Sequence, residues 1–142
     1  MKRIVLDTNV LVSGLISPHG PPGRIVDWLR AGVLELAVDD RILHEYAEVL
    51  RRPYFATYFS AAEGGELIRY LELNSAQVVC SRHGRGLPDP KDAPFWETAY
   101  AAGVSLVTGN IRHFPPQPDM VVAVLTPAQF VARNEGSLRA ES

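Results

Sequence analysis

The strongest constraint on the fold of this chain is its alternation of short apolar runs with stretches of helical periodicity. Five apolar runs have the length and composition of strands, and helical or partly helical stretches separate them. Strands that alternate with helices are typical of α/β proteins whose central sheet is mostly parallel. We therefore predict an α/β fold.

Hydrophobic spacing and capping signals place the elements along the chain. We expect strands at residues 2–6, 33–38, 76–80, 104–108 and 120–125. We expect helices at residues 9–16, 24–32, 41–52, from 60 up to the third strand, at 92–103, and from 126 onwards. Two of these helices begin with a capping-box pattern, Ser60 with Glu63 and Thr126 with Gln129.

Length and composition limit the class of protein. The 142 residues are enough for one domain, which we place at 1–134, followed by a polar tail at 135–142 that we expect to be flexible. The apolar runs are too short to span a membrane, and the single cysteine excludes an internal disulfide, so we expect a cytoplasmic protein with no membrane partner. The net charge of −2 gives no global basic field, so any nucleic-acid contact requires a local patch.

Polar residues lie just after the carboxyl ends of the predicted strands, where ligands usually bind. In open α/β sheets that place is the crevice at the carboxyl ends of the strands. Asp7 ends the first strand, Asn110 follows the fourth, and Asp92 opens the helix after the third strand and its loop. Asp92 falls within the apolar stripe of its helix, and Glu45 lies at the edge of the stripe of another helix.

Each acid also has a local interpretation when taken alone. Asp7 suits a strand-end turn or a helix cap, and Asp92 suits an N-cap before Pro94. Glu45 suits an exposed helix surface, and Asp89 suits the turn in "LPDPK". The joint pattern is harder to explain locally, because several carboxylates at one sheet edge repel one another and lose hydration. A bound cation would neutralise them, and ligands that are all oxygen favour Mg²⁺ or Mn²⁺.

Four segments resemble the PIN-domain ribonucleases in order and spacing. They are "IVLDTNVLVSGL", "LHEYAEVL", "DPKDAPFWETAYAAG" and "LVTGN", and the resemblance extends from Lys2 to about Val131. Within that family, the chain is most similar to the small prokaryotic proteins related to VapC toxins of toxin–antitoxin pairs. The resemblance implies a three-layer α/β/α sandwich, a site of acidic residues that binds Mg²⁺ or Mn²⁺, and cleavage of single-stranded or loop RNA.

The resemblance also implies roles for individual residues. The predicted catalytic residues are Asp7, Glu45, Asp92 and Asn110, of which Asp7, Asp92 and Glu45 would bind the metal. The predicted supporting residues are Thr8, Asn9, Thr108 and Asp89. The sequence departs from the family pattern at Asn110, where aspartate is common. Asparagine can still offer a carbonyl oxygen, but it removes a negative charge. The sequence therefore does not decide whether the site holds a second metal ion or whether the enzyme is weakened.

RNA binding would require cations near this site. The candidates are Arg51, Arg52, Arg82, Arg85, Lys91 and Arg112. The aromatic residues that follow Arg52 could stack on bases, or they could pack a helical hairpin or a dimer interface.

The predicted function is that of a metal-dependent endoribonuclease, the toxin of a toxin–antitoxin system, with an antitoxin as protein partner and a homodimer as its assembly. The alternative is a catalytically weakened PIN-like module that binds RNA or acts as a scaffold. A receiver-like phosphate acceptor fits less well, because "DTN" lacks the second aspartate of a DxD motif.

Overall fold

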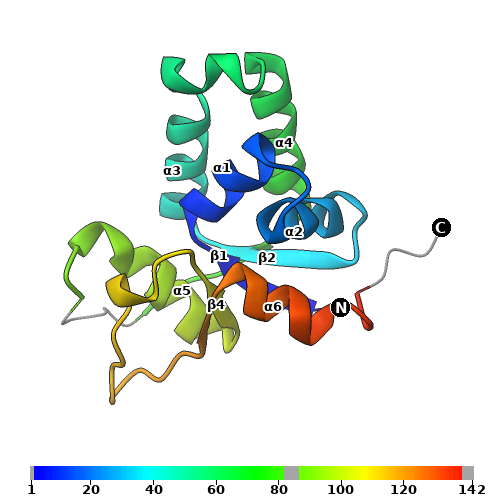
Figure 1. Cartoon of the computed structure of the whole chain (residues 1–142). Helices are drawn as coiled ribbons and strands as arrows, with labels where there is room; N and C mark the ends of the chain where they lie inside the picture. Colours follow the sequence, from blue (N-terminus) through cyan, green and yellow to red (C-terminus); the bar gives the residue numbers. More distant parts are fainter. Residues whose placement is uncertain (1, 82–86, 139–142) are drawn as a thin grey trace.

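The computed structural model describes residues 2–81 and 87–138, which form a parallel five-stranded sheet with helices on both faces (Figure 1). The strands are β1 (Lys2–Leu6), β2 (Leu34–Val38), β3 (Ala76–Gln77), β4 (Ser105–Val107) and β5 (Val124–Leu125). The helices are α1 (Thr8–Ile16), α2 (Pro21–Arg30), α3 (Asp40–Leu50), α4 (Ala61–Asn74), α5 (Ala93–Ala102) and α6 (Pro127–Asn134). Three short 3-10 helices are η1 (Pro53–Thr57), η2 (Pro90–Asp92) and η3 (Ile111–His113). The predicted α/β/α sandwich with a parallel sheet is confirmed.

The strand order is β3-β2-β1-β4-β5, so the first strand lies in the middle of the sheet. From β1 the chain adds β2 and β3 on one side and then crosses to add β4 and β5 on the other. The direction of winding therefore reverses between β1 and β4. Such a reversal opens a crevice at the carboxyl ends of the two strands.

The helices divide between the two faces of the sheet. Figure 1 shows α1, α2, α3 and α4 above β2 as drawn and α5 below it, and α6 packs against α2. The central strand β1 is apolar and fully buried at Ile4, Val5 and Leu6, because helices cover it on both sides. The sheet is therefore a rigid platform for the residues that follow its strands.

The two predicted capping boxes are confirmed, whereas Asp7 and Asp92 make no side-chain capping hydrogen bond. The Ser60 and Thr126 side chains each accept a hydrogen bond from the backbone N–H three residues later, and both capping boxes are complete. Asp39 caps α3 by accepting from the Ile42 N–H at 3.0 Å. Gly103 ends α5 with a φ of 68°, a left-handed conformation that favours glycine.

The two outer strands are shorter than predicted. We expected strands at 76–80 and 120–125, whereas β3 and β5 contain two residues each. Val79 and Val121, two of the apolar residues that suggested longer strands, are 90% and 77% exposed. An outer strand has a neighbour on one side only, and its extent depends on contacts that local hydrophobicity does not reveal.

The end of the described chain packs on the domain. Glu135 forms an ion pair with Arg24 at 2.5 Å, and Leu138 is buried. The domain boundary after residue 134 stays a prediction. In residues 2–81 and 87–138, no helix combines the length and apolarity needed to cross a bilayer.

Candidate functional site

Asp7 has a fixed position because a strand and a helix meet at it. Its N–H donates to the Val107 carbonyl at 2.9 Å, which extends the pairing of β1 with β4, and α1 begins at the next residue. The Thr108 hydroxyl donates to Asp7 Oδ2 at 2.8 Å. Burial raises the pKa of Asp7 above its usual value, and hydrogen bonds from Thr108, Thr8 and Asn9 oppose that rise. A carboxylate is therefore held at the carboxyl end of the central strand.

Glu45 of α3 is connected to the same strand end. The buried Thr8 hydroxyl donates to Glu45 Oε2, and the next residue, Tyr46, donates from its hydroxyl to the Leu6 carbonyl at 2.5 Å. Burial, with the charges of Asp7 and Glu45, raises the pKa of the Tyr46 phenol well above its usual value, so this phenol stays a donor. These contacts point Glu45 inward from α3.

Asp92 precedes α5 at the N-cap position, but its side chain makes no capping hydrogen bond. Its Oδ2 atom is buried and has no hydrogen-bond partner among the described residues. Burial, followed by the nearby charge of Asp7, raises the pKa of Asp92 to about 6. Asp89 and Glu45 contribute to the same rise. Buried polar atoms are usually hydrogen-bonded, and a bound group could supply the hydrogen bond or ligand contact that Oδ2 lacks among the described residues.

The histidine at 113 is a site residue that the sequence indicates only weakly, as a candidate for phosphate contact beside Arg112. Its Nδ1 atom lies 3.4 Å from Asp92 Oδ2, which is an ion-pair distance for a protonated imidazole although no hydrogen bond forms. The charge of His113 acts to lower the pKa values of both Asp92 and Asp7. The only signal in the sequence was its place three residues after Asn110.

The remaining predicted polar residues differ in their surroundings. Asn110 is exposed, and its backbone N–H donates to Thr108 Oγ1 at 3.0 Å. Asn9 is also exposed, on the first turn of α1. Asp89 accepts from the Lys91 N–H at 2.9 Å and so shapes the turn before α5. Among the predicted residues, hydrogen bonds join Thr108 to Asp7 and Thr8 to Glu45, and the charges of Asp7 and Glu45 act on Asp92.

The predicted RNA-binding cations separate into two groups. Lys91 and Arg112 are exposed next to Asp92 and His113. Arg51 and Arg52 are exposed beyond the end of α3, about 9 Å along the helix axis from the level of Glu45. The last two candidates, Arg82 and Arg85, lie outside the described residues.

The donor set suits a hard cation, because it consists of carboxylate, hydroxyl and amide oxygens. The unpartnered Asp92 oxygen and the mutual repulsion of the acids also favour a cation. In the described part of the chain, however, no three His, Cys, Asp or Glu side chains are close enough to hold a metal together. A divalent cation at this edge of the sheet would therefore have few direct protein ligands and would keep several waters, as Mg²⁺ commonly does.

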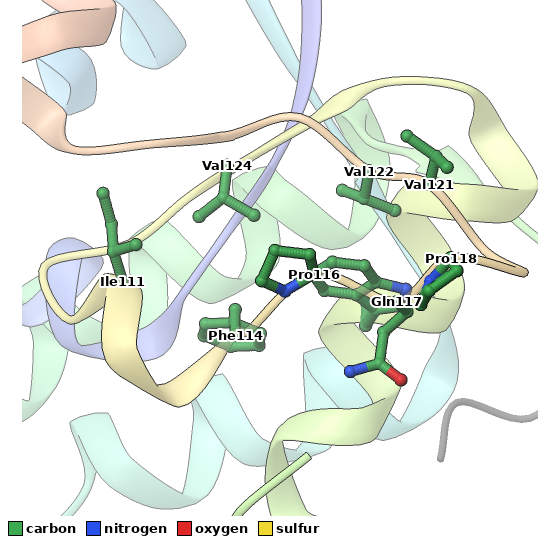
Figure 2. A pocket seen from close by; sticks show the side chains of 9 residues that line it. Ile111, Phe114, Pro116, Gln117, Pro118, Val121, Val122 and Val124 are labelled. Carbon is green, nitrogen blue, oxygen red and sulfur yellow. The ribbon is translucent and has the colours of Figure 1, made fainter. Parts of the chain in front are cut away.

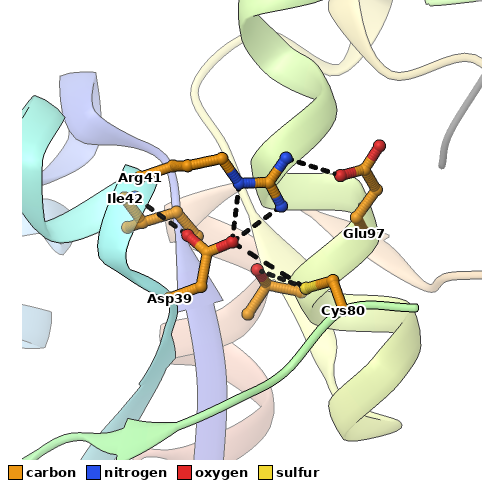
Figure 3. A network of polar contacts seen from close by, with 6 residues as sticks. Asp39, Arg41, Ile42, Cys80 and Glu97 are labelled. Carbon is orange, nitrogen blue, oxygen red and sulfur yellow. Dashed lines mark hydrogen bonds and ion pairs between the residues drawn. The ribbon is translucent and has the colours of Figure 1, made fainter. Parts of the chain in front are cut away.

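Two other features lie near these carboxylates. A cavity of about 340 Å³ has uncharged walls, and Ile111 and Phe114 line it, whereas His113 of the same segment faces Asp92 (Figure 2). An ion-pair network joins α3 to α5 through Arg41 (Figure 3). Neither feature contributes a carboxylate to the group around Asp7.

A family model described as the PIN domain matches residues 3–112, which is most of the chain. The chain belongs to the PIN domain family. The uncharacterized protein MJ1680 of Methanocaldococcus jannaschii is 26% identical over 111 residues, which cover 76% of this chain and 70% of that protein.

Among solved structures, this PIN domain resembles a chain of VapBC2 from Rickettsia felis, crystallised with a DNA fragment from the promoter. The TM-score is 0.55 at 15% identity, and the match covers 87% of this chain and 98% of that one. At this low identity the likeness concerns the fold, and it agrees with the α/β/α architecture described above.

Proposed function

We propose that this PIN domain is an endoribonuclease that depends on Mg²⁺ or Mn²⁺. The observation that supports the proposal best is that the charges of Asp7 and Glu45 act on Asp92 at the carboxyl edge of the sheet, where one buried Asp92 oxygen has no hydrogen-bond partner among the described residues. PIN domains are generally nucleases, which agrees with a site built from acids. In this proposal Asp7 and Asp92 bind the metal, and Glu45 binds it directly or through a water.

A divalent cation held there would supply positive charge for a phosphate oxygen and a more acidic water. The chain's own residues would fix the geometry. Thr108 orients the Asp7 carboxylate through its hydrogen bond, and Thr8 orients Glu45. The Asn110 N–H in turn fixes the Thr108 hydroxyl. Lys91 and Arg112 would contact the RNA phosphates beside the carboxylates.

The proposed biological setting is a toxin–antitoxin pair. It rests on the VapC-like sequence motifs and on the structural likeness to VapBC2, whose structure includes promoter DNA. We propose an antitoxin as the protein partner, a homodimer as the assembly and the cytoplasm as the location.

Asn110 favours a second candidate function. An amide at this place brings no charge to the metal, and the residue is exposed. A PIN domain with three carboxylates and a weak metal site could bind RNA without cleaving it. Metal affinity separates the two candidates, because a decayed site would bind no Mn²⁺.

The decisive experiment is cleavage of a labelled panel of partly single-stranded RNAs with Mg²⁺ or Mn²⁺, with an EDTA control. We expect metal-dependent cleavage by the wild type and none by Asp92→Asn. The matched control is Asp27→Asn, since Asp27 is exposed on α2 and this change removes an equal charge elsewhere. Cleavage that survives EDTA would contradict the metal dependence. RNA binding with neither cleavage nor Mn²⁺ binding would support the second candidate.

A further inference from the structure

An ion pair links the helix that carries Glu45 to the helix that follows Asp92. Arg41 Nη1 of α3 lies 2.8 Å from Glu97 Oε1 of α5, and Glu97 is only 3% exposed (Figure 3). The same guanidinium contacts Asp39 Oδ2 through Nη2 at 2.7 Å and through Nε at 2.8 Å. Arg41 is thus held from two sides.

Each residue of the Arg41–Glu97 ion pair lies near a carboxylate of the candidate site on or just before its own helix. Arg41 lies four residues before Glu45, one turn away on the same side of α3. Glu97 lies in the second turn of the helix that starts immediately after Asp92. The pair therefore joins the two helices close to the places where they present their acids.

Other contacts between these helices are limited. α3 packs mainly against α4, and it meets α5 over a short stretch only. Helix α5 packs against β1, β2 and β4, whereas α3 contacts the sheet chiefly at β2. A charged link between α3 and α5 therefore has more influence on their separation than it would between helices in broad contact.

We propose that Arg41 and Glu97 are positioning residues that hold Glu45 and Asp92 at the separation needed for divalent-cation binding. The assignment rests on the proposed metal-dependent function. Neither residue touches the metal in this scheme. Each acts through the helix that carries it, as groups that support metal ligands generally do.

The test must separate positioning from stability, because Arg41→Met alone leaves the buried Glu97 carboxylate without its guanidinium. The double variant Arg41→Met/Glu97→Gln removes both charges of this pair, so that no Glu97 carboxylate is left buried without Arg41, and Asp39 keeps its hydrogen bond from the Ile42 N–H. The matched control is Arg3→Met, which breaks the Arg3–Glu35 pair of 2.6 Å between β1 and β2. The Arg3 and Arg41 side chains are similarly exposed, at 48% and 45%.

Mn²⁺ affinity of the folded proteins is measured by titration calorimetry, and stability by urea unfolding in EDTA. We expect Mn²⁺ binding to weaken about 10- to 100-fold in the double variant, the range typical for groups that support metal ligands, and to be unchanged in Arg3→Met. Wild-type affinity in the double variant would overturn the assignment and leave the pair a structural one. A wild type that binds no Mn²⁺ would overturn the proposed function and this assignment with it.

Discussion

Thr108 occupies a central position among the residues of the site. Its hydroxyl accepts from the Asn110 N–H at 3.0 Å and donates to Asp7 Oδ2 at 2.8 Å, and the residue is fully buried. Valine has nearly the same shape but can neither donate nor accept. The substitution therefore tests the hydrogen bonds and leaves the packing almost intact.

We expect Thr108→Val to lower the free energy of unfolding by about 1–3 kcal/mol, since a buried carboxylate loses its hydroxyl donor. The pKa of Asp7 should rise further, because this hydrogen bond acts to lower it. Urea unfolding in EDTA measures the loss. The exposed Thr57→Val is the control and should have little effect. Equal losses in the two variants would show that the Thr108 hydrogen bonds contribute nothing.

Asn110→Asp tests the departure from the family pattern. An additional carboxylate beside Asp7 and Asp92 should strengthen Mn²⁺ binding, because it adds a negative ligand oxygen. Without metal the same change should lower stability through repulsion between like charges. Calorimetric titration with Mn²⁺ and unfolding in EDTA measure the two effects. Unchanged Mn²⁺ binding would place residue 110 away from the cation.

The pKa of Asp92 predicts how the stability of the metal-free protein depends on pH. The ordinary pKa of 3.8 describes the unfolded chain, and the folded value is about 6. Between these two values the folded protein binds more protons than the unfolded one, so stability falls as pH rises through this window. Above about pH 6 the folded protein has lost all of the stability that the protonated Asp92 carboxyl contributes at low pH.

The measurement is urea unfolding in EDTA at pH 5 and pH 7, for the wild type and for Asp92→Asn. We expect the wild type to lose more stability over this interval than the variant, which lacks the titrating carboxyl. An identical pH dependence would mean that Asp92 is not perturbed by its burial and by Asp7.

Among the secondary-structure elements, α1 and α2 meet where glycine is required. A Cβ on Gly23 would lie 2.1 Å from the Pro18 carbonyl oxygen, a backbone atom that cannot move aside easily. Gly65 of α4 has open space at the same position. The two glycines therefore respond to alanine in opposite ways.

We expect Gly23→Ala to destabilise the fold by about 1–3 kcal/mol through overpacking. Gly65→Ala should stabilise it by about 0.5–1 kcal/mol, because alanine suits a helix interior better than glycine. Chemical unfolding of both variants checks the contrast. A neutral Gly23→Ala would show that the connection between α1 and α2 can adjust.

Most elements could be predicted from the sequence, because their signals are local. Helix caps depend on side chains three residues apart, and the buried part of β1 is a continuous apolar run, Ile4 to Leu6. The ends of β3 and β5 could not be predicted, since pairing with a distant neighbour decides them.

The same distinction applies to the candidate site. Asp7 could be selected because it ends a strand. Glu97 has the appearance of an ordinary helix glutamate, and its partner Arg41 lies 56 residues away. His113 likewise gains its importance from Asp92, which is distant in sequence. Contacts between remote segments leave no local pattern.

In the molecule as a whole, the chain reverses its direction of winding between β1 and β4. Asp7 follows one of these strands and Thr108 the other, so the site lies where α/β sheets usually bind ligands. The placement explains why acids from several elements meet there although no two of them are neighbours in sequence.

A cation that binds only the folded protein should stabilise the whole domain. We expect Mn²⁺ at 100 times its dissociation constant to add about 2.7 kcal/mol to the free energy of unfolding. Asp92→Asn should lose most of this gain. Thermal unfolding with and without Mn²⁺ measures both. Equal stabilisation of the two proteins would locate Mn²⁺ elsewhere on the molecule.

The central position of β1 also has a consequence during synthesis. Asp7 leaves the ribosome early, but β4, which must pair with β1, ends at Val107, and the Thr108 hydroxyl follows it. A nascent chain that has not yet exposed these residues lacks half of the crevice. Any chemistry that depends on this edge of the sheet therefore begins only after nearly the whole domain has emerged.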